Sequence, residues 1–158
     1  MVYHAARKCP IGMLLVEHSS ARELMQKNGY IRILLVDDNE PFRRFISSLL
    51  RERANLQVIG ESDDGLQAVR KAETLQPDLI LLDIGLPGIN GIEAGRQIIK
   101  VARKVRIIFL TQESSPEVVQ EAFDLGAWAY IVKARAGSEL LPALEAVSRG
   151  ERLVNKHN

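Results

Sequence analysis

The sequence predicts an open α/β fold, in which a five-stranded parallel sheet carries helices on both faces. From residue 31 onward, short apolar runs alternate five times with segments of helical period. The runs mostly lack polar alternation, which is typical of strands covered on both sides. The 158 residues, 46% of them hydrophobic, make about one domain with an ordinary core.

The five apolar runs are the predicted strands, and a helix is expected after each of them. The strands are predicted at residues 33–36, 56–59, 79–82, 107–110 and 130–132. Strict alternation of strands and helices indicates a parallel sheet, because each connection has to cross back over the sheet. The predicted strand order is 2-1-3-4-5, as in flavodoxin-like folds.

The first two helices are predicted from apolar stripes. The first stripe contains Phe42, Phe45, Ile46, Leu49 and Leu50. Asn39 is available as its cap, and Pro41 is tolerated in its first turn. The second stripe contains Leu66, Val69, Ala72 and Leu75, and Pro77 ends that helix.

The other three helices are predicted from their end signals. Turn residues place the third helix at about 91–102. Ser114 and Glu117 have the spacing of a capping box and predict the start of the fourth helix, which Gly126 ends. The fifth helix is expected from near Ser138 to just before Gly150.

This pattern divides the chain into three parts. Residues 1–30 are predicted to form an N-terminal extension, residues 31–150 the globular domain, and residues 151–158 a C-terminal tail. One interpretation of the extension is that translation begins at Met25, which mass analysis of the natural N-terminus tests. A "QKNG" turn signal separates the extension from the domain.

Composition excludes several classes of protein. A net charge of +1 without a dense Lys/Arg tract argues against a large nucleic-acid surface. The clean apolar runs are four to six residues long, far below the ~20 that span a bilayer. The single cysteine, Cys9, has no internal disulfide partner, so a reducing cytoplasm is the expected compartment.

Polar side chains follow four of the five predicted strands. Asp37 and Asp38 follow the first, Asp83 the third, Thr111 the fourth and Lys133 the fifth. In the order 2-1-3-4-5 these four strands are neighbours, and ligands bind at the carboxyl ends of such strands. The second strand, at the edge, ends in "GESDDG", a sequence typical of a turn and a helix cap.

The chemistry of this set predicts phosphoryl transfer. Three carboxylates held together raise one another's pKa unless a cation lies between them, and Mg²⁺ prefers such oxygen ligands. Lysine and threonine can contact a phosphoryl group, and aspartate can accept one as an acyl phosphate. A turn and cap role explains each residue alone, but it does not explain the whole set on the correct strands.

Four stretches of the chain resemble the receiver domain of two-component response regulators, nearest to receivers of the NarL/FixJ type. They are "LLVDDNEP", "PDLILLDIGLPGINGIE", "IIFLTQESS" and "GAWAYIVKARAGSELLPALEAV". The resemblance covers residues 31–150 and implies a CheY-like fold. It also implies a signalling phosphoacceptor, not an enzyme for other substrates, which receives its phosphoryl group from a histidine kinase or a histidine phosphotransfer protein.

The resemblance implies a role for each residue of the metal site. Asp83 matches the phosphoacceptor. Asp38 and Asp83 match direct ligands of Mg²⁺, the carbonyl of Gly85 matches a further ligand, and Asp37 matches a residue that acts through water.

The resemblance also implies a switch. Thr111 matches the switch hydroxyl, Lys133 the lysine that contacts the phosphoryl group, and Tyr130 the aromatic residue that turns with the switch. Two positions depart from the common pattern: Gln112 stands where a small residue is usual, and Ala134 where proline is frequent.

The output of such a receiver has several alternatives. The chain is expected to signal through protein contacts or homodimerisation, without a DNA-binding domain or membrane segment of its own. It is alternatively the receiver part of a truncated DNA-binding transcriptional regulator. A degenerate receiver that serves as a phosphorylation-independent scaffold is expected to lack a key residue, and none is lacking. A hydrolase acting on external substrates needs a cap that the short connections leave no room for.

Overall fold

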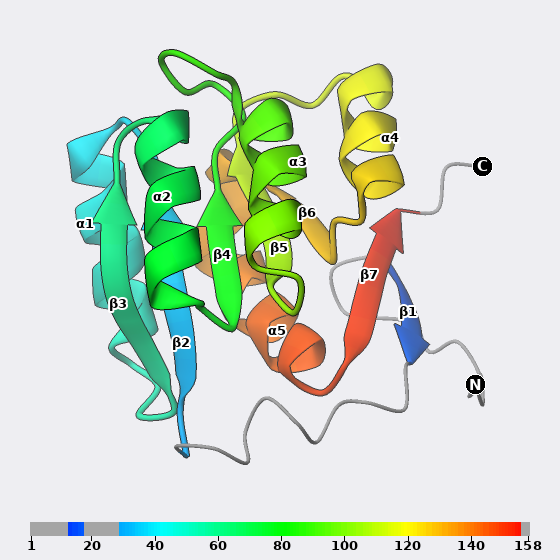
Figure 1. Ribbon diagram of the computed structural model, residues 1–158. Coiled ribbons are helices and arrows are strands. Elements are labelled where there is room, and N and C mark those ends of the chain that lie inside the picture. The colour runs from blue at the N-terminus through cyan, green and yellow to red at the C-terminus, as the bar shows by residue number, and fades with distance from the viewer. Residues whose placement is uncertain (1–12, 18–28, 156–158) are drawn as a thin grey trace.

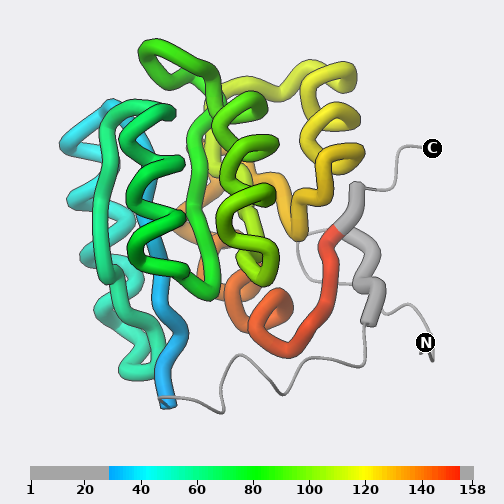
Figure 2. The backbone as a smooth tube through the Cα atoms, viewed as in Figure 1, coloured from blue at the N-terminus to red at the C-terminus, as the bar shows by residue number. Residues whose placement is uncertain are grey.

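The computed structural model describes residues 13–17 and 29–155, with backbone pairing alone for strand residues 13–17, 154 and 155 (Figures 1 and 2). The strands are β1 (Met13–Glu17), β2 (Ile31–Val36), β3 (Leu56–Ser62), β4 (Leu79–Leu82), β5 (Arg106–Thr111), β6 (Ala129–Val132) and β7 (Glu151–Asn155). The helices are α1 (Glu40–Leu50), α2 (Gly65–Leu75), α3 (Gly91–Val101), α4 (Pro116–Leu125) and α5 (Ala136–Ser148), with a short 3₁₀ turn, η1 (Lys133–Arg135).

The main sheet has five parallel strands in the order β3-β2-β4-β5-β6. These are the five strands expected from residue 31 onward, so the predicted order 2-1-3-4-5 is confirmed. Because β2, β4, β5 and β6 are neighbours, their carboxyl ends lie along one edge of the sheet. That edge is where the sequence places its polar side chains.

The helices cover both faces of this sheet. Helices α1 and α5 lie behind it in Figure 1, and α2, α3 and α4 lie in front. Alternate strand residues supply the two cores: Leu79 and Leu81 pack with α1 and α5, whereas Ile80 and Leu82 pack with α2, α3 and α4. Strands buried on both sides need apolar residues at every position, which explains the unalternated runs.

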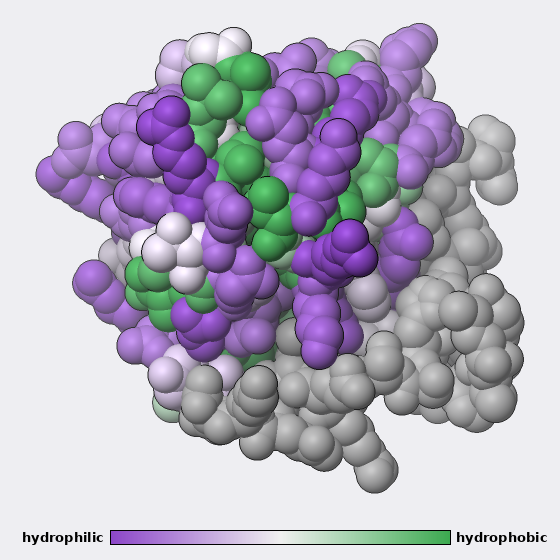
Figure 3. Space-filling view, in the orientation of Figure 1, coloured by the Kyte–Doolittle hydropathy of each residue, from purple (hydrophilic) through white to green (hydrophobic). Residues whose placement is uncertain are grey.

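The outer surface of the α2 and α3 layer is mostly hydrophilic. Figure 3 shows hydrophobic areas that are small and separated by polar side chains. None of the helices within residues 29–155 combines the length and the apolar character needed to cross a bilayer.

Two residues of the predicted apolar stripes face solvent. Phe45 is 46% exposed and Leu66 is 48% exposed. Helix α2 instead buries Gly65 and Ala68, together with Ala72 of the predicted stripe. Small residues let the helix approach the sheet closely, and this turns the helix so that Leu66 points outward.

The predicted capping box at the start of α4 is wrong. The cap residue is Ser115, and its side chain makes no capping hydrogen bond. Instead, Glu113 Oε1 accepts hydrogen bonds from the amides of Ser114, at 3.0 Å, and Ser115, at 2.8 Å. Pro116 opens the helix and restricts Ser115 to extended backbone. Glu113 takes the Ser114 amide, which the Glu117 carboxylate would accept in a capping box.

Strands β1 and β7 join the two ends of the described chain. They pair antiparallel, with Met13 opposite Asn155 and Glu17 opposite Glu151, and neither strand is among the elements that the sequence predicts. Strand β7 lies against the domain, because the amide of Leu153 donates to the carbonyl of Trp128 at 2.7 Å and the Leu153 side chain is buried. Met25 and Cys9 lie outside the described residues.

Candidate functional site

Three carboxylates and one ammonium group meet at the carboxyl edge of the sheet. Asp37 and Asp38 follow β2 and Asp83 follows β4, and one oxygen from each lies within 4.8 Å of the others. Lys133 follows β6, and its Nζ lies 2.6 Å from Asp37 Oδ2 and 3.0 Å from Asp83 Oδ2. Residues far apart in the sequence are therefore brought to one place by the strand order.

Backbone hydrogen bonds fix the two buried carboxylates. Asp37 Oδ1 accepts from the amide of Asn39 at 2.8 Å, and Asp83 Oδ1 accepts from the amide of Gly85 at 3.3 Å. In each carboxylate the other oxygen faces Lys133. The orientation of both groups is thus set by the loops that follow β2 and β4.

Gly91 holds the strand end that carries Asp83. Its amide donates to the carbonyl of Ile84 at 2.8 Å. A Cβ at this position would lie 1.9 Å from the carbonyl oxygen of Asp83, so only glycine lets α3 begin so close to the strand. From the sequence, Gly91 is predicted only as the start of a helix; the "GING" turn is the signal that could have indicated the close approach.

The charges of the cluster do not cancel. Burial raises the pKa of Asp37, and the hydrogen bonds from Lys133 and Asn39 only partly oppose that effect. Burial alone lowers the pKa of Lys133, but its hydrogen bonds to Asp37 and Asp83 outweigh this and hold the pKa above its usual range. One ammonium among three carboxylates leaves negative charge, which favours a cation.

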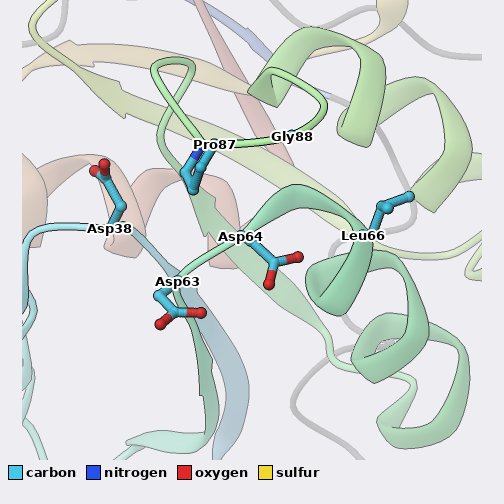
Figure 4. A pocket seen from close by; sticks show the side chains of 6 residues that line it. All are labelled: Asp38, Asp63, Asp64, Leu66, Pro87 and Gly88. Atoms are coloured by element: carbon cyan, nitrogen blue, oxygen red, sulfur yellow. The ribbon is translucent and has the colours of Figure 1, made fainter.

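An open depression of about 490 Å³ adjoins the cluster (Figure 4). Its lining residues come from the loops after β2, β3 and β4 and from the first turn of α2: Asp38, Asp63, Asp64, Leu66, Pro87 and Gly88. Asp38 is exposed, whereas Asp37 and Asp83 are buried, so the depression gives solvent access to the acidic cluster. Asp64 caps α2 by accepting from the amide of Gln67 at 2.7 Å, which confirms the turn and cap interpretation of "GESDDG".

Thr111 and Tyr130 are linked through the backbone of Glu113. Thr111 Oγ1 accepts from the Glu113 amide at 3.3 Å, and the Tyr130 hydroxyl donates to the Glu113 carbonyl at 2.5 Å. Both side chains are buried, and the Tyr130 ring lies 6.2 Å from the ring of Phe109. Burial, together with the charges of Glu113 and Asp83, raises the pKa of Tyr130 above its usual range, so the hydroxyl stays protonated.

Phe42 also reaches the site. The Lys133 Nζ lies 4.7 Å from the centre of the Phe42 ring. From the sequence, Phe42 is predicted only as a member of the apolar stripe of α1, and no signal within that stripe distinguishes it from its neighbours. Gln112, Gly85 and Ala134 are exposed, and Ala134 lies in η1.

Fold and site together are those of a phosphorylation-dependent signalling domain, and comparisons with known proteins name the family. The family model of the response regulator receiver domain matches residues 33–145 of this chain. LiaR, a transcriptional regulatory protein of Bacillus subtilis, is 38% identical over 121 residues, which are 77% of this chain and 57% of LiaR. The response regulator VraR of Staphylococcus aureus is 37% identical over 121 residues, 77% of this chain and 58% of VraR. The chain belongs to the response regulator receiver family, whose general function is switching by phosphorylation.

Solved structures agree with this assignment. The response regulator domain of Thermotoga maritima CheB has a TM-score of 0.70 and 32% identity, covering 75% of this chain and 96% of that one. A LuxR-family regulator from Aurantimonas has a TM-score of 0.74 and 34% identity, covering 78% of this chain and 88% of that one. The receiver of a NarL regulator from Mycobacterium tuberculosis has a TM-score of 0.72 and 26% identity, covering 77% and 98%.

Proposed function

We propose that Asp83 accepts a phosphoryl group from a phosphohistidine on a sensor kinase or a histidine phosphotransfer protein. One observation carries the proposal: the ammonium of Lys133 lies between the carboxylates of Asp37 and Asp83, beside an open depression. A cation fixed at that position can attract an anionic phosphoryl group and stabilise the charge that develops on it. Of these two carboxylates, Asp83 is the proposed acceptor because it follows β4, the middle strand of the sheet.

The transfer balances as a substitution at phosphorus. An Asp83 carboxylate oxygen attacks the phosphorus, the bond from phosphorus to the imidazole nitrogen breaks, and the imidazole leaves with the electron pair of that bond. The product on Asp83 is an acyl phosphate. Lys133 then contacts a phosphoryl oxygen, and Thr111 can hydrogen-bond another.

The acidic cluster fits Mg²⁺. Three carboxylates with oxygens within 4.8 Å of one another are hard donors, and Lys133 offsets only part of their charge. Asp38, Asp83 and the carbonyl of Gly85 would hold the ion directly, and Asp37 through water. When bound, the ion neutralises charge on the transferring phosphoryl group.

Switching is proposed to involve the loop between β5 and α4. Phosphorylation raises the charge on Asp83 to nearly two negative units, which attracts the Thr111 hydroxyl. Movement of Thr111 changes the Glu113 backbone that Tyr130 also contacts. The equilibrium between two packings then shifts by the difference in their contacts with the phosphoryl group, and α4, β6 and α5 form the readout surface.

The proposed output is a protein contact, including homodimerisation, in the cytoplasm, with no reaction on external substrates. The relatives favour a second candidate, a receiver that acts within a longer transcriptional regulator. This chain spans 57% of LiaR, which is named as such a regulator. Measurement of molar mass in solution, with and without the phosphoryl mimic beryllofluoride, tests for dimerisation; an unchanged monomer would contradict it.

Phosphorylation is tested with a small phosphodonor such as acetyl phosphate. With Mg²⁺ we expect intact-mass analysis to show a gain of one phosphoryl group. No gain is expected when a chelator withholds the metal from the start, or in Asp83→Asn. Asp63→Asn is the matched control, since Asp63 is an exposed carboxylate of the same depression outside the cluster. Folded protein that gains no mass would contradict the proposal and favour a phosphorylation-independent scaffold.

A further inference from the structure

Four contacts form a closed circuit around the Lys133 ammonium. Asp37 pairs with Lys133 through Oδ2, at 2.6 Å, and accepts the Asn39 amide through Oδ1, at 2.8 Å. Asn39 Oδ1 accepts the amide of Phe42 at 2.9 Å, and the Phe42 ring covers the Lys133 ammonium at 4.7 Å. The segment that supplies Asp37 therefore also supplies a cover for the cation that Asp37 binds.

From this circuit we propose that Phe42 is a positioning residue for the phosphoryl-transfer site. Its ring fixes the Lys133 ammonium in the place from which the ammonium serves Asp83. The inference rests on the proposed phosphoacceptor function and adds a residue to it. A cation over an aromatic face is attracted by the ring quadrupole, and the attraction strengthens as water is removed.

The geometry leaves the ammonium little freedom. Two of its sides face Asp37 and Asp83, at 2.6 and 3.0 Å, and the Phe42 ring lies 4.7 Å away. The Lys133 side chain is only 12% exposed although it ends in a charge. A lysine side chain without such a cover can sample several rotamers, so the ring reduces the reorganisation needed when a phosphoryl group arrives.

The start of α1 is built so that Phe42 keeps this position. The Asn39 cap binds the Phe42 amide directly. The next residue, Arg43, donates from its guanidinium to the Asp37 carbonyl at 2.6 Å, which ties the same turn to the end of β2. Phe42 is therefore held from both sides, by its own amide and by its neighbour.

The test compares three variants of two aromatic residues in α1. Phe42→Leu keeps an apolar side chain of similar size but removes the ring, whereas Phe42→Tyr keeps the ring. Phe45→Leu is the matched control: Phe45 lies one helical turn away, its ring centre is 6.0 Å from that of Phe42, and it is 46% exposed. Phosphorylation by acetyl phosphate with Mg²⁺ is followed by intact mass, so no kinase surface is involved.

We expect Phe42→Leu to slow phosphorylation about three- to tenfold, and the other two variants to stay near the wild-type rate. A second readout is independent of phosphorylation. In ¹H–¹³C NMR spectra the ε-methylene protons of Lys133, assigned with Lys133→Arg, should be shifted by the ring current in the wild type. Phe42→Leu should abolish that shift and Phe45→Leu should leave it unchanged.

The outcomes separate this inference from the function on which it rests. If the wild type gains no phosphoryl group, the proposed function fails, and the role in phosphoryl transfer fails with it, even if the ring-current shift confirms the contact. If the wild type is phosphorylated, a Phe42→Leu rate equal to the wild-type rate overturns the inference, as does slowing by Phe42→Tyr to the same extent. An unchanged Lys133 resonance in Phe42→Leu overturns it as well.

Discussion

At the carboxyl edge of the sheet, Lys133 compensates only part of the charge of Asp37, Asp38 and Asp83. Two of these carboxylates are buried, so their repulsion is screened less than it would be at an open surface. The site therefore costs stability when no metal is bound, and it gains stability when a cation arrives. Function and stability conflict at these residues.

Replacing Asp83 by asparagine should stabilise the metal-free protein. The change removes a like charge beside Asp37 and Asp38, and we expect it to raise the free energy of unfolding by about 1–2 kcal/mol. Mg²⁺ should reduce the difference because it stabilises the wild type. Urea unfolding, followed by the fluorescence of Trp128, measures both effects.

The control for this experiment is Asp63→Asn, which should change stability by less than about 0.5 kcal/mol because Asp63 is exposed. An Asp83→Asn protein less stable than the wild type in metal-free buffer would show that attraction to Lys133 outweighs the repulsion.

Tyr130 should make stability fall in alkaline solution. Its pKa is raised in the folded protein, by burial first and then by the charges of Glu113 and Asp83. Above the ordinary phenol pKa of about 10, the folded protein retains a proton that the unfolded chain loses. The contribution of the Tyr130 hydroxyl to the free energy of unfolding is therefore complete below about pH 10 and is lost as the pH rises further.

Tyr130→Phe removes this contribution, so its free energy of unfolding should decline less steeply above about pH 10 than that of the wild type. Lys133, whose pKa is also raised, acts in the same direction in both proteins and does not affect the comparison. Urea unfolding at a series of pH values measures the slopes. Equal slopes would mean that the hydroxyl contacts water in the folded protein.

At the scale of helices and strands, local sequence signals were informative about where helices begin and end. The sequence did not indicate which residues make close contacts there. Asn39 caps α1 and Gly126 ends α4 as the sequence predicts, because these signals act within one turn of backbone. The capping box at Ser114 was wrong because Glu113 accepts the Ser114 amide that Glu117 would bind in such a box. Competition of this kind depends on loop geometry, which spacing does not contain.

Gly91 shows how an element positions the site. A Cβ there would lie 1.9 Å from the Asp83 carbonyl oxygen, so Gly91→Ala must displace either α3 or the end of β4. We expect it to lower the free energy of unfolding by about 2–3 kcal/mol. Denaturant unfolding measures this change.

Gly95, in the middle of the same helix, is the matched control. A Cβ at Gly95 would meet only side-chain atoms at 3.5 Å or more. Gly95→Ala should therefore be neutral or stabilise by about 0.5–1 kcal/mol through the lower entropy of the unfolded chain. If Gly91→Ala is no worse than Gly95→Ala, the close approach of α3 to Asp83 is not required.

For the whole molecule, the sequence predicted the strand order of the main sheet best. It predicted the structure at the chain ends least. Strand order could be inferred because the alternation of strands and helices, and the polar strand ends, both depend on the sheet as a unit. The β1–β7 pair could not, since two five-residue strands 138 positions apart at their first residues carry no shared signal. For the same reason the contact of Phe42 with Lys133 is visible only in three dimensions.

Strand β1 should protect the backbone of β7. Replacing Leu14 and Leu15 together by proline removes two successive amides, one of which must face β7, because neighbouring amides in a strand point to opposite sides. Hydrogen exchange at residues 151–155 should then accelerate about tenfold or more. A chain that begins at Met25 should behave like this variant, because it lacks β1 altogether.

Exchange within β4 serves as the internal control, since that strand lies in the centre of the other sheet. Unchanged exchange in β7 would show that its contact with Trp128 alone maintains the strand.

The most direct test of the account is to locate the phosphoryl group on the chain. Protein treated with acetyl phosphate and Mg²⁺ is reduced with borohydride, which converts an aspartyl phosphate to homoserine, and peptide sequencing by mass spectrometry then finds the modified position. We predict homoserine at residue 83 alone, and none when Mg²⁺ is omitted. Homoserine at residue 37 or 38, or at no position in folded protein, would contradict the assignment of Asp83 as the phosphoacceptor.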